Sequence, residues 1–157
     1  MSTEKEFESG LFKIKTGSEF ETFALKLFSW QAINNPVYAE FISRLGVHRE
    51  KVRKITDIPF LPIEFFKTKK VVSGSGKTVL VFKSSGTTSL SPSHHHVLNS
   101  RLYETSILHG FQNNYGNISD YHILALMPER EHSSLVYMVN FLSERSEKKK
   151  SGFYFYR

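Results

Sequence analysis

The chain has 157 residues, a formal net charge of +6 and an aromatic fraction of 14%. This is the length of one domain with one core, and the absence of cysteine excludes disulfides, thiol nucleophiles and cysteine metal sites. The sequence has neither a signal peptide nor a run of about 18 apolar residues, so we expect a cytoplasmic protein without a membrane span.

Helical patterns dominate the first part of the chain. Ser18 and Glu21 have the spacing of a capping box, and apolar residues follow at helical intervals, which predicts a helix over about 19–33. Asn35 is the predicted N-cap of a second helix, because Pro36 suits a first helical position. Two helices are therefore expected before any strand.

Proline and glycine set the local structure of the next part. Residues 57–63 carry two prolines three positions apart, which excludes a helix interior and favours an extended segment lying against the core. Residues 70–72 and 78–82 are β-prone runs on either side of a stretch of serine and glycine. This arrangement is typical of a β-hairpin.

The last part of the chain alternates helices and strands. A helix is predicted over 99–115, an apolar strand over 121–127, a helix capped by Ser133 or Ser134, and a final strand over 153–156. Together with the strand at 78–82, this order implies an α/β fold. We expect two leading helices followed by a largely parallel β-α-β-α-β sheet covered by helices.

Residues 83–93 form a loop rich in hydroxyl groups and glycine directly after a predicted strand. Gly86 can adopt a positive φ, so the backbone can approach a ligand closely, and neighbouring N–H groups can converge on one anion. The Ser and Thr hydroxyls can donate to phosphate oxygens or hold a magnesium-bound water, and Lys83 adds a positive charge. The loop lacks the ending of a Walker loop and the dinucleotide G-x-G-x-x-G, and a simple flexible turn remains an alternative.

Other chemistries find little support in the sequence. In an extended segment His94 and His96 point one way and His95 the other, which is poor geometry for a shared metal, so we expect no metal site. There is no H-E-x-x-H, paired-carboxylate or G-x-S-x-G pattern, which argues against metallohydrolases, glycosidases and serine hydrolases. The aromatic run at 153–156 could stack RNA bases, but a buried strand is the better interpretation, so we expect no nucleic-acid partner.

Several blocks of the sequence occur in a recognisable order. They are residues 58–67, 84–88, 120–126 with Pro128, and 133–139. Together they resemble the adenylate-forming superfamily and, more closely, the acyl-protein synthetase family called LuxE. The resemblance runs from about residue 17 to the last residue. It implies that residues 17–157 are the truncated N-terminal portion of an AMP-binding domain with a β-hairpin phosphate loop, preceded by a polar tail at 1–16.

The resemblance implies an ATP-dependent ligase with ATP and magnesium as cofactors. A fatty acid would be activated as its acyl-adenylate, and the acyl group would pass to a protein thiol, for a partner of the acyl-CoA reductase type. The loop would hold the β- and γ-phosphates between strands at 79–83 and about 94–97, and this segment would also form part of the acyl pocket. The positions that match the family's phosphate loop are Ser84, Ser85, Gly86, Thr87 and Thr88.

The chain also departs from the family pattern. Ser89 stands where the second glycine is usual, and no lysine follows Pro92, so Ser93 or His94 would have to replace that contact alongside Lys83. The family's catalytic residues are expected beyond residue 157 and its acyl-accepting cysteine is absent, so we expect the isolated chain to be inactive. The alternative is a non-catalytic, truncated paralogue that acts as a docking module. The acid, the acceptor and any link to bioluminescence stay open.

Overall fold

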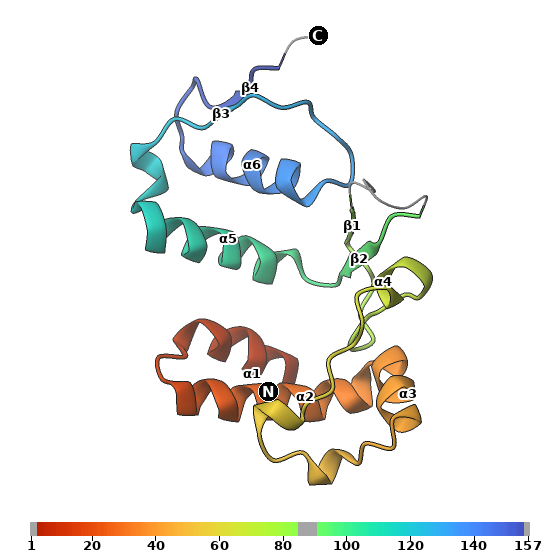
Figure 1. Ribbon diagram of the computed structural model, residues 1–157. Helices are drawn as coiled ribbons and strands as arrows, with labels where there is room; N and C mark the ends of the chain where they lie inside the picture. Colours follow the sequence, from red (N-terminus) through yellow and green to blue (C-terminus); the bar gives the residue numbers. More distant parts are fainter. Residues whose placement is uncertain (1–2, 85–90, 156–157) are drawn as a thin grey trace. The chain divides into compact units, whose positions relative to one another are not determined.

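The computed structural model describes residues 3–84 and 91–155. The chain divides into two compact units, one ending at Lys77 and the other beginning at Thr78. Each unit has its own cluster of buried hydrophobic residues, where the length of the chain predicted a single core. The fold is mixed α/β, with helices in both units and strands in the second (Figure 1).

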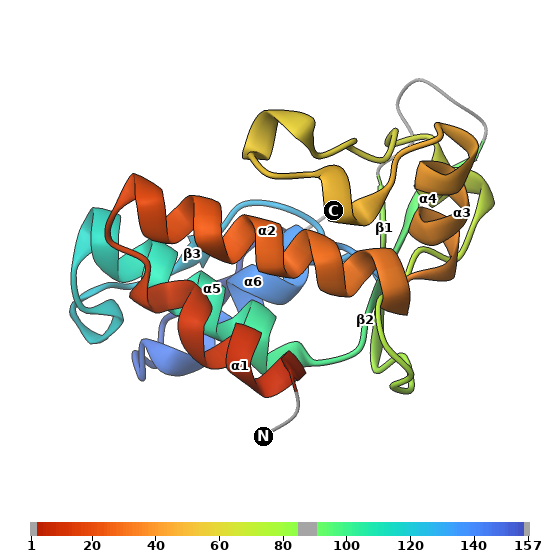
Figure 2. The same cartoon turned by 90° about the horizontal axis from the view of Figure 1, so that it is seen from below.

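The first unit is built from helices and short turns. Its elements are α1 (Thr3–Gly10), η1 (Leu11–Lys13), α2 (Gly17–Asn34), α3 (Pro36–Arg44), η2 (Arg49–Lys51), η3 (Ile55–Asp57) and α4 (Phe65–Thr68). Helix α1 lies along α2 (Figures 1 and 2), where the Phe7 ring contacts Phe23 and Trp30 at centroid distances of 5.5 and 5.7 Å. The segment expected to be a polar tail thus carries a helix held by an aromatic side chain.

Helix α2 begins at a capping box that lies two residues before the predicted one. The backbone N–H of Glu19 donates to the Thr16 hydroxyl at 3.2 Å, and the Glu19 carboxylate accepts from the Thr16 N–H at 3.0 Å. The predicted pair, Ser18 and Glu21, was therefore wrong. Both pairs have the same spacing, and in each a hydroxyl residue is followed by a glutamate, so the local pattern alone could not separate them.

Helix α3 and the extended segment after it agree with the sequence prediction. Asn35 is the N-cap, since its side chain accepts from the Tyr38 N–H at 3.1 Å, and Pro36 is the first helical residue. The Tyr38 hydroxyl donates to the Pro59 carbonyl at 2.7 Å, which fixes the proline-containing segment against the core. The buried core of this unit consists of Phe28, Tyr38 and Ile42.

Over residues 78–84 and 91–155, the second unit combines two long helices with four short strands. Its elements are β1 (Leu80–Lys83), β2 (His94–Val97), α5 (Ser100–Tyr115), η4 (Ile118–Asp120), β3 (Leu124–Ala125), α6 (Ser134–Arg145) and β4 (Gly152–Phe153). Asn99 caps α5, and Ser133, one of the two predicted candidates, caps α6. Helices α5 and α6 pack around a core of Ile107, Ile118, Phe141 and Leu142. No helix in the described ranges is long and apolar enough to cross a membrane.

The predicted β-α-β-α-β sheet is not observed. In the described part of the chain β1 pairs with β2 in an antiparallel sheet, and β3 pairs with β4 in a separate parallel sheet. Residues 70–72 form no strand, because β1 finds its partner in β2. The other edge of β1 is occupied by His132, whose carbonyl accepts from the Lys83 N–H at 2.9 Å. Because the Lys83 N–H is bonded to His132, it is not available to pair with a further strand at this edge of β1.

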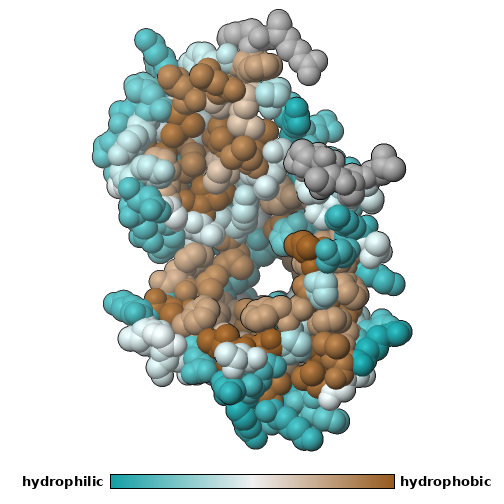
Figure 3. Space-filling view, in the orientation of Figure 1, coloured by the Kyte–Doolittle hydropathy of each residue, from teal (hydrophilic) through white to brown (hydrophobic). Residues whose placement is uncertain are grey.

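The parallel pair is covered on one face. Ala125 is 7% exposed and faces the interior, whereas its neighbours Leu124 and Leu126 are 60% and 78% exposed. Successive residues of a strand point to opposite faces, so the two leucines share the outer face. Figure 3 shows apolar side chains at the surface of both units.

Candidate phosphate-binding site

The candidate loop connects two antiparallel strands, as expected. In the register of β1 and β2, Lys83 lies opposite His94 and Leu80 lies opposite Val97. The strands predicted at 79–83 and 94–97 are thereby confirmed. Both ends of the loop are thus held at one place on the second unit.

The neck of the loop is closed by two hydrogen bonds between Ser84 and Ser93. The Ser84 N–H donates to the Ser93 carbonyl at 3.1 Å, and the Ser93 N–H donates to the Ser84 hydroxyl oxygen at 2.9 Å. Because this oxygen acts as an acceptor here, the hydroxyl proton remains available for donation. Ser84, an exposed residue and a predicted phosphate ligand, therefore keeps the group that a phosphate oxygen needs.

Two basic side chains flank the mouth of the loop. Residues directly opposite in an antiparallel pair project from the same face, so Lys83 and His94 lie side by side there. Lys83 is exposed and His94 is half-buried. The same register places His96 on this face and His95 on the other, opposite Phe82, as the alternation predicted. Within residues 3–84 and 91–155, no three His, Cys, Asp or Glu side chains are grouped to hold a metal ion.

An aromatic cluster anchors the hairpin to both helices of the unit. Phe82 is buried, and its ring lies 5.2 Å from Tyr103 of α5 and 5.6 Å from Tyr137 of α6, centroid to centroid. The Tyr137 hydroxyl donates to the Glu104 carboxylate at 2.7 Å, and burial raises the pKa of Tyr137 to about 12. Tyr137 is therefore a neutral donor at physiological pH, and the strand that carries Lys83 and leads into Ser84 is fixed to a rigid support.

His132 joins this site, although it belongs to none of the sequence motifs described above. Its backbone carbonyl accepts from the Lys83 N–H at 2.9 Å, and its Nδ1 lies 3.2 Å from the Val81 carbonyl oxygen. Since a carbonyl only accepts, the ring must donate from Nδ1. His132 also has φ = 61°, which is uncommon for a residue other than glycine. Its position directly before the Ser133 cap was the available sequence signal.

The structure describes three of the seven predicted site residues. Lys83, Ser84 and His94 come together at the neck of the loop. The remaining four lie outside the described residues: Ser85, Gly86, Thr87 and Thr88. Comparison with protein-family models, with curated proteins and with solved structures finds no match to this chain. The LuxE resemblance therefore stays a prediction.

Proposed function

We propose that this chain is part of an ATP-dependent ligase that activates a carboxylic acid, and that the loop between β1 and β2 binds the triphosphate of ATP. The observation that carries the proposal is the closed neck, where the Ser84 hydroxyl oxygen accepts from the Ser93 N–H and does not use its proton in this contact, beside Lys83 and His94. Nucleotidyl transfer asks little of a protein beyond positioning and charge stabilisation. Hydroxyl and ammonium donors at one end of a hairpin fit that requirement.

The reaction follows from the resemblance to acyl-protein synthetases. An oxygen of the fatty acid carboxylate attacks the α-phosphorus, the bond to the β-phosphate breaks, and pyrophosphate leaves. A thiol then attacks the acyl carbon, and AMP departs. The chain contains no cysteine, so this thiol lies outside it, on a protein acceptor such as a reductase-type partner. Magnesium would be held mainly by phosphate oxygens, with hydroxyls of the loop holding its waters.

The first test is calorimetric titration of the chain with magnesium-ATP. We expect saturable binding that Lys83→Gln weakens by roughly fivefold, the effect of about 1 kcal/mol for an exposed charge contact. Lys77→Gln removes another exposed lysine and serves as the matched control. Absence of binding, or equal loss in both variants, would refute the triphosphate site.

The second test addresses the reaction in the full-length protein, should the chain be part of one. Thr87→Ala and Thr88→Ala are each expected to lower fatty-acid-dependent ATP–pyrophosphate exchange by roughly 100-fold, because each removes a preorganised donor to developing charge. Ser106→Ala, an exposed hydroxyl on α5, is the control. Unchanged exchange in both threonine variants would exclude these residues from the mechanism.

A non-catalytic docking module is the second candidate, and the outer face of the β3–β4 sheet favours it. Leu124 and Leu126 are exposed on this face, and Tyr154, the next residue in register, is 39% exposed. Parallel sheets are usually covered on both faces. If this candidate is correct, Leu126→Asp should abolish co-purification with a reductase-type protein, while Leu45→Asp in the other unit should not. ATP binding should then be absent.

A further inference from the structure

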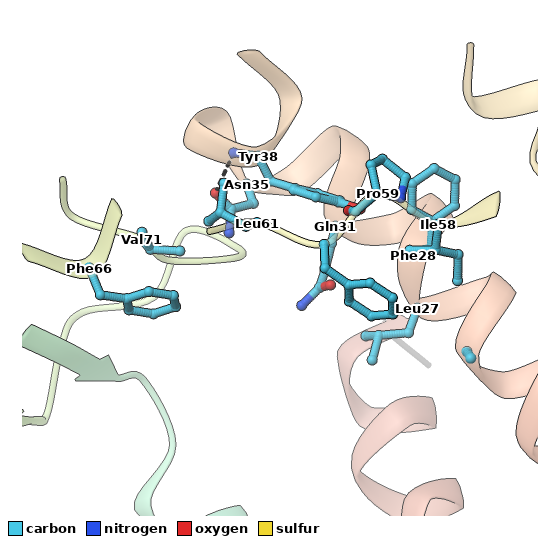
Figure 4. A pocket seen from close by; sticks show the side chains of 12 residues that line it. Leu27, Phe28, Gln31, Asn35, Tyr38, Ile58, Pro59, Leu61, Phe66 and Val71 are labelled. Carbon is cyan, nitrogen blue, oxygen red and sulfur yellow. Dashed lines mark hydrogen bonds between the residues drawn. The ribbon is translucent and has the colours of Figure 1, made fainter. Parts of the chain in front are cut away.

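A pocket of about 350 Å³ lies in the first unit (Figure 4). It is formed by α2, the start of α3 and the proline-containing segment, and its volume falls in the range of about 300–1,000 Å³ typical of small-molecule sites. Its lining consists of Ala24, Leu27, Phe28, Gln31, Asn35, Tyr38, Ile58, Pro59, Phe60, Leu61, Phe66 and Val71. Phe60 is 76% exposed and therefore lies at the rim.

None of the lining side chains is charged, although 23% of the residues of the chain are. A carboxylate, phosphate or ammonium group inside such a pocket would lose its hydration without gaining a partner of opposite charge. That desolvation costs several kcal/mol in real proteins. The lining therefore selects against ions and favours apolar groups.

Two of the three polar lining residues are already hydrogen-bonded. The Asn35 side chain accepts from the Tyr38 N–H at 3.1 Å and donates to the Ser73 hydroxyl at 3.1 Å. The Tyr38 hydroxyl donates to the Pro59 carbonyl at 2.7 Å. These groups hold the walls of the pocket together and have little left to offer a ligand.

Gln31 differs from both. Its carboxamide makes no hydrogen bond with another residue in the described part of the chain, and Figure 4 shows it extending among the apolar side chains of the pocket. A carboxamide offers two N–H donors and one carbonyl acceptor, and it carries no charge. It is suited to pair with a neutral group that both donates and accepts, such as a primary amide or an alcohol.

We propose that this pocket is a binding site for a neutral, apolar ligand that carries one uncharged hydrogen-bonding group, paired with Gln31. The apolar body lies against Leu27, Phe28 and Leu61, and Phe60 covers it at the rim. Burial of the apolar part provides most of the affinity, and Gln31 selects the polar end. A ligand with an ionised end has to keep that end outside the pocket.

The experiment compares three probes of equal chain length by calorimetry: decanamide, decanoate and decylammonium. Decanamide is expected to bind at least tenfold more tightly than either ion. Gln31→Leu should reduce decanamide affinity by roughly threefold to tenfold, which is the effect of one hydrogen bond. The difference in affinity between decanamide and the two ions should therefore become smaller. Equal affinity for the three probes, or no binding of decanamide, would overturn the proposal.

A second pair of variants separates the pocket from non-specific binding. Ala24→Leu fills the pocket and should abolish decanamide binding, whereas Ala39→Leu places the same side chain on α3 outside it. Thermal unfolding of both variants shows whether each one folds. If two folded variants bind decanamide equally, the pocket is not the site. These titrations contain no ATP, so they can fail without affecting the triphosphate proposal.

Discussion

The backbone N–H of Lys83 donates a hydrogen bond of 2.9 Å to the carbonyl oxygen of His132. The His132 ring donates to the Val81 carbonyl on the same edge of β1, so one residue provides the pairing that a neighbouring strand would otherwise give. This contact ties the start of the candidate loop to the residue just before the α6 cap, Ser133.

At His132 we expect glycine to be a less destabilising substitution than alanine, which is the reverse of the usual order. His132→Ala loses the ring hydrogen bond and keeps the unfavourable φ of 61°, while His132→Gly loses the same bond but relieves the backbone. The alanine variant should therefore be less stable than the glycine variant by about 1 kcal/mol, measured by urea unfolding. At exposed His122, whose φ is not positive, the order should reverse. Equal stability of the two His132 variants would contradict this account.

Asn35→Ala should cost more than an ordinary cap substitution. Asn35 is 5% exposed, caps α3 and donates to Ser73, so its loss removes the cap and leaves a nearly buried backbone donor without its partner. We expect about 2 kcal/mol of lost unfolding free energy, against about 1 kcal/mol for Thr16→Ala at the exposed cap of α2. Chemical denaturation measures the free energy of unfolding of both variants. A larger loss in Thr16→Ala than in Asn35→Ala would contradict this prediction.

Because the pKa of Tyr38 is raised in the folded state, we expect the chain to lose stability at alkaline pH. Burial raises the pKa of Tyr38 from 10.0 to about 12, so the folded state keeps a proton that the unfolded state releases in this window. Stability is unaffected by this group below about pH 10 and falls as the pH rises from about 10 to about 12. Urea unfolding across this window should show a smaller decline in Tyr38→Phe than in the wild-type chain. If the unfolding free energy falls equally with pH in both chains, the pKa of Tyr38 is not raised by folding.

Two glycines of the α5 region should respond in opposite directions. Gly110 is an exposed helical residue, and a Cβ added there meets no atom within 4 Å, so Gly110→Ala should stabilise the chain by about 0.5–1 kcal/mol. Gly116 ends the helix at φ = 89° and ψ = −150°, a region nearly restricted to glycine. Gly116→Ala should cost about 1–3 kcal/mol. Thermal melts of both variants test the pair, and a stabilising Gly116→Ala would refute the backbone argument.

The first residues of the helices show how much of the fold the local sequence predicts. The caps at Asn35, Asn99 and Ser133 depend on a side chain and a backbone N–H two or three residues later, and the sequence contains both partners. The same kind of pattern gave the wrong N-cap for α2, because Thr16 and Ser18 are each followed by a glutamate three residues later. Strand lengths were overestimated, since the apolar run at 121–127 yields the two-residue strand Leu124–Ala125. An apolar run indicates burial and does not specify a pairing partner.

The sequence alone determined the helices α2, α3, α5 and α6 and the caps of α3 and α6, because each depends on interactions over a few residues. The two strands that flank the candidate loop were expected from a β-prone run and from the family resemblance. Only the tertiary structure decided that β3 pairs with β4 in a sheet separate from β1 and β2, that His132 occupies the other edge of β1, and that Gln31 lies in an apolar pocket with Pro59. These relationships join residues far apart in the chain. They arise from the competition among many apolar faces and backbone groups for burial and hydrogen bonds, which a local pattern does not encode.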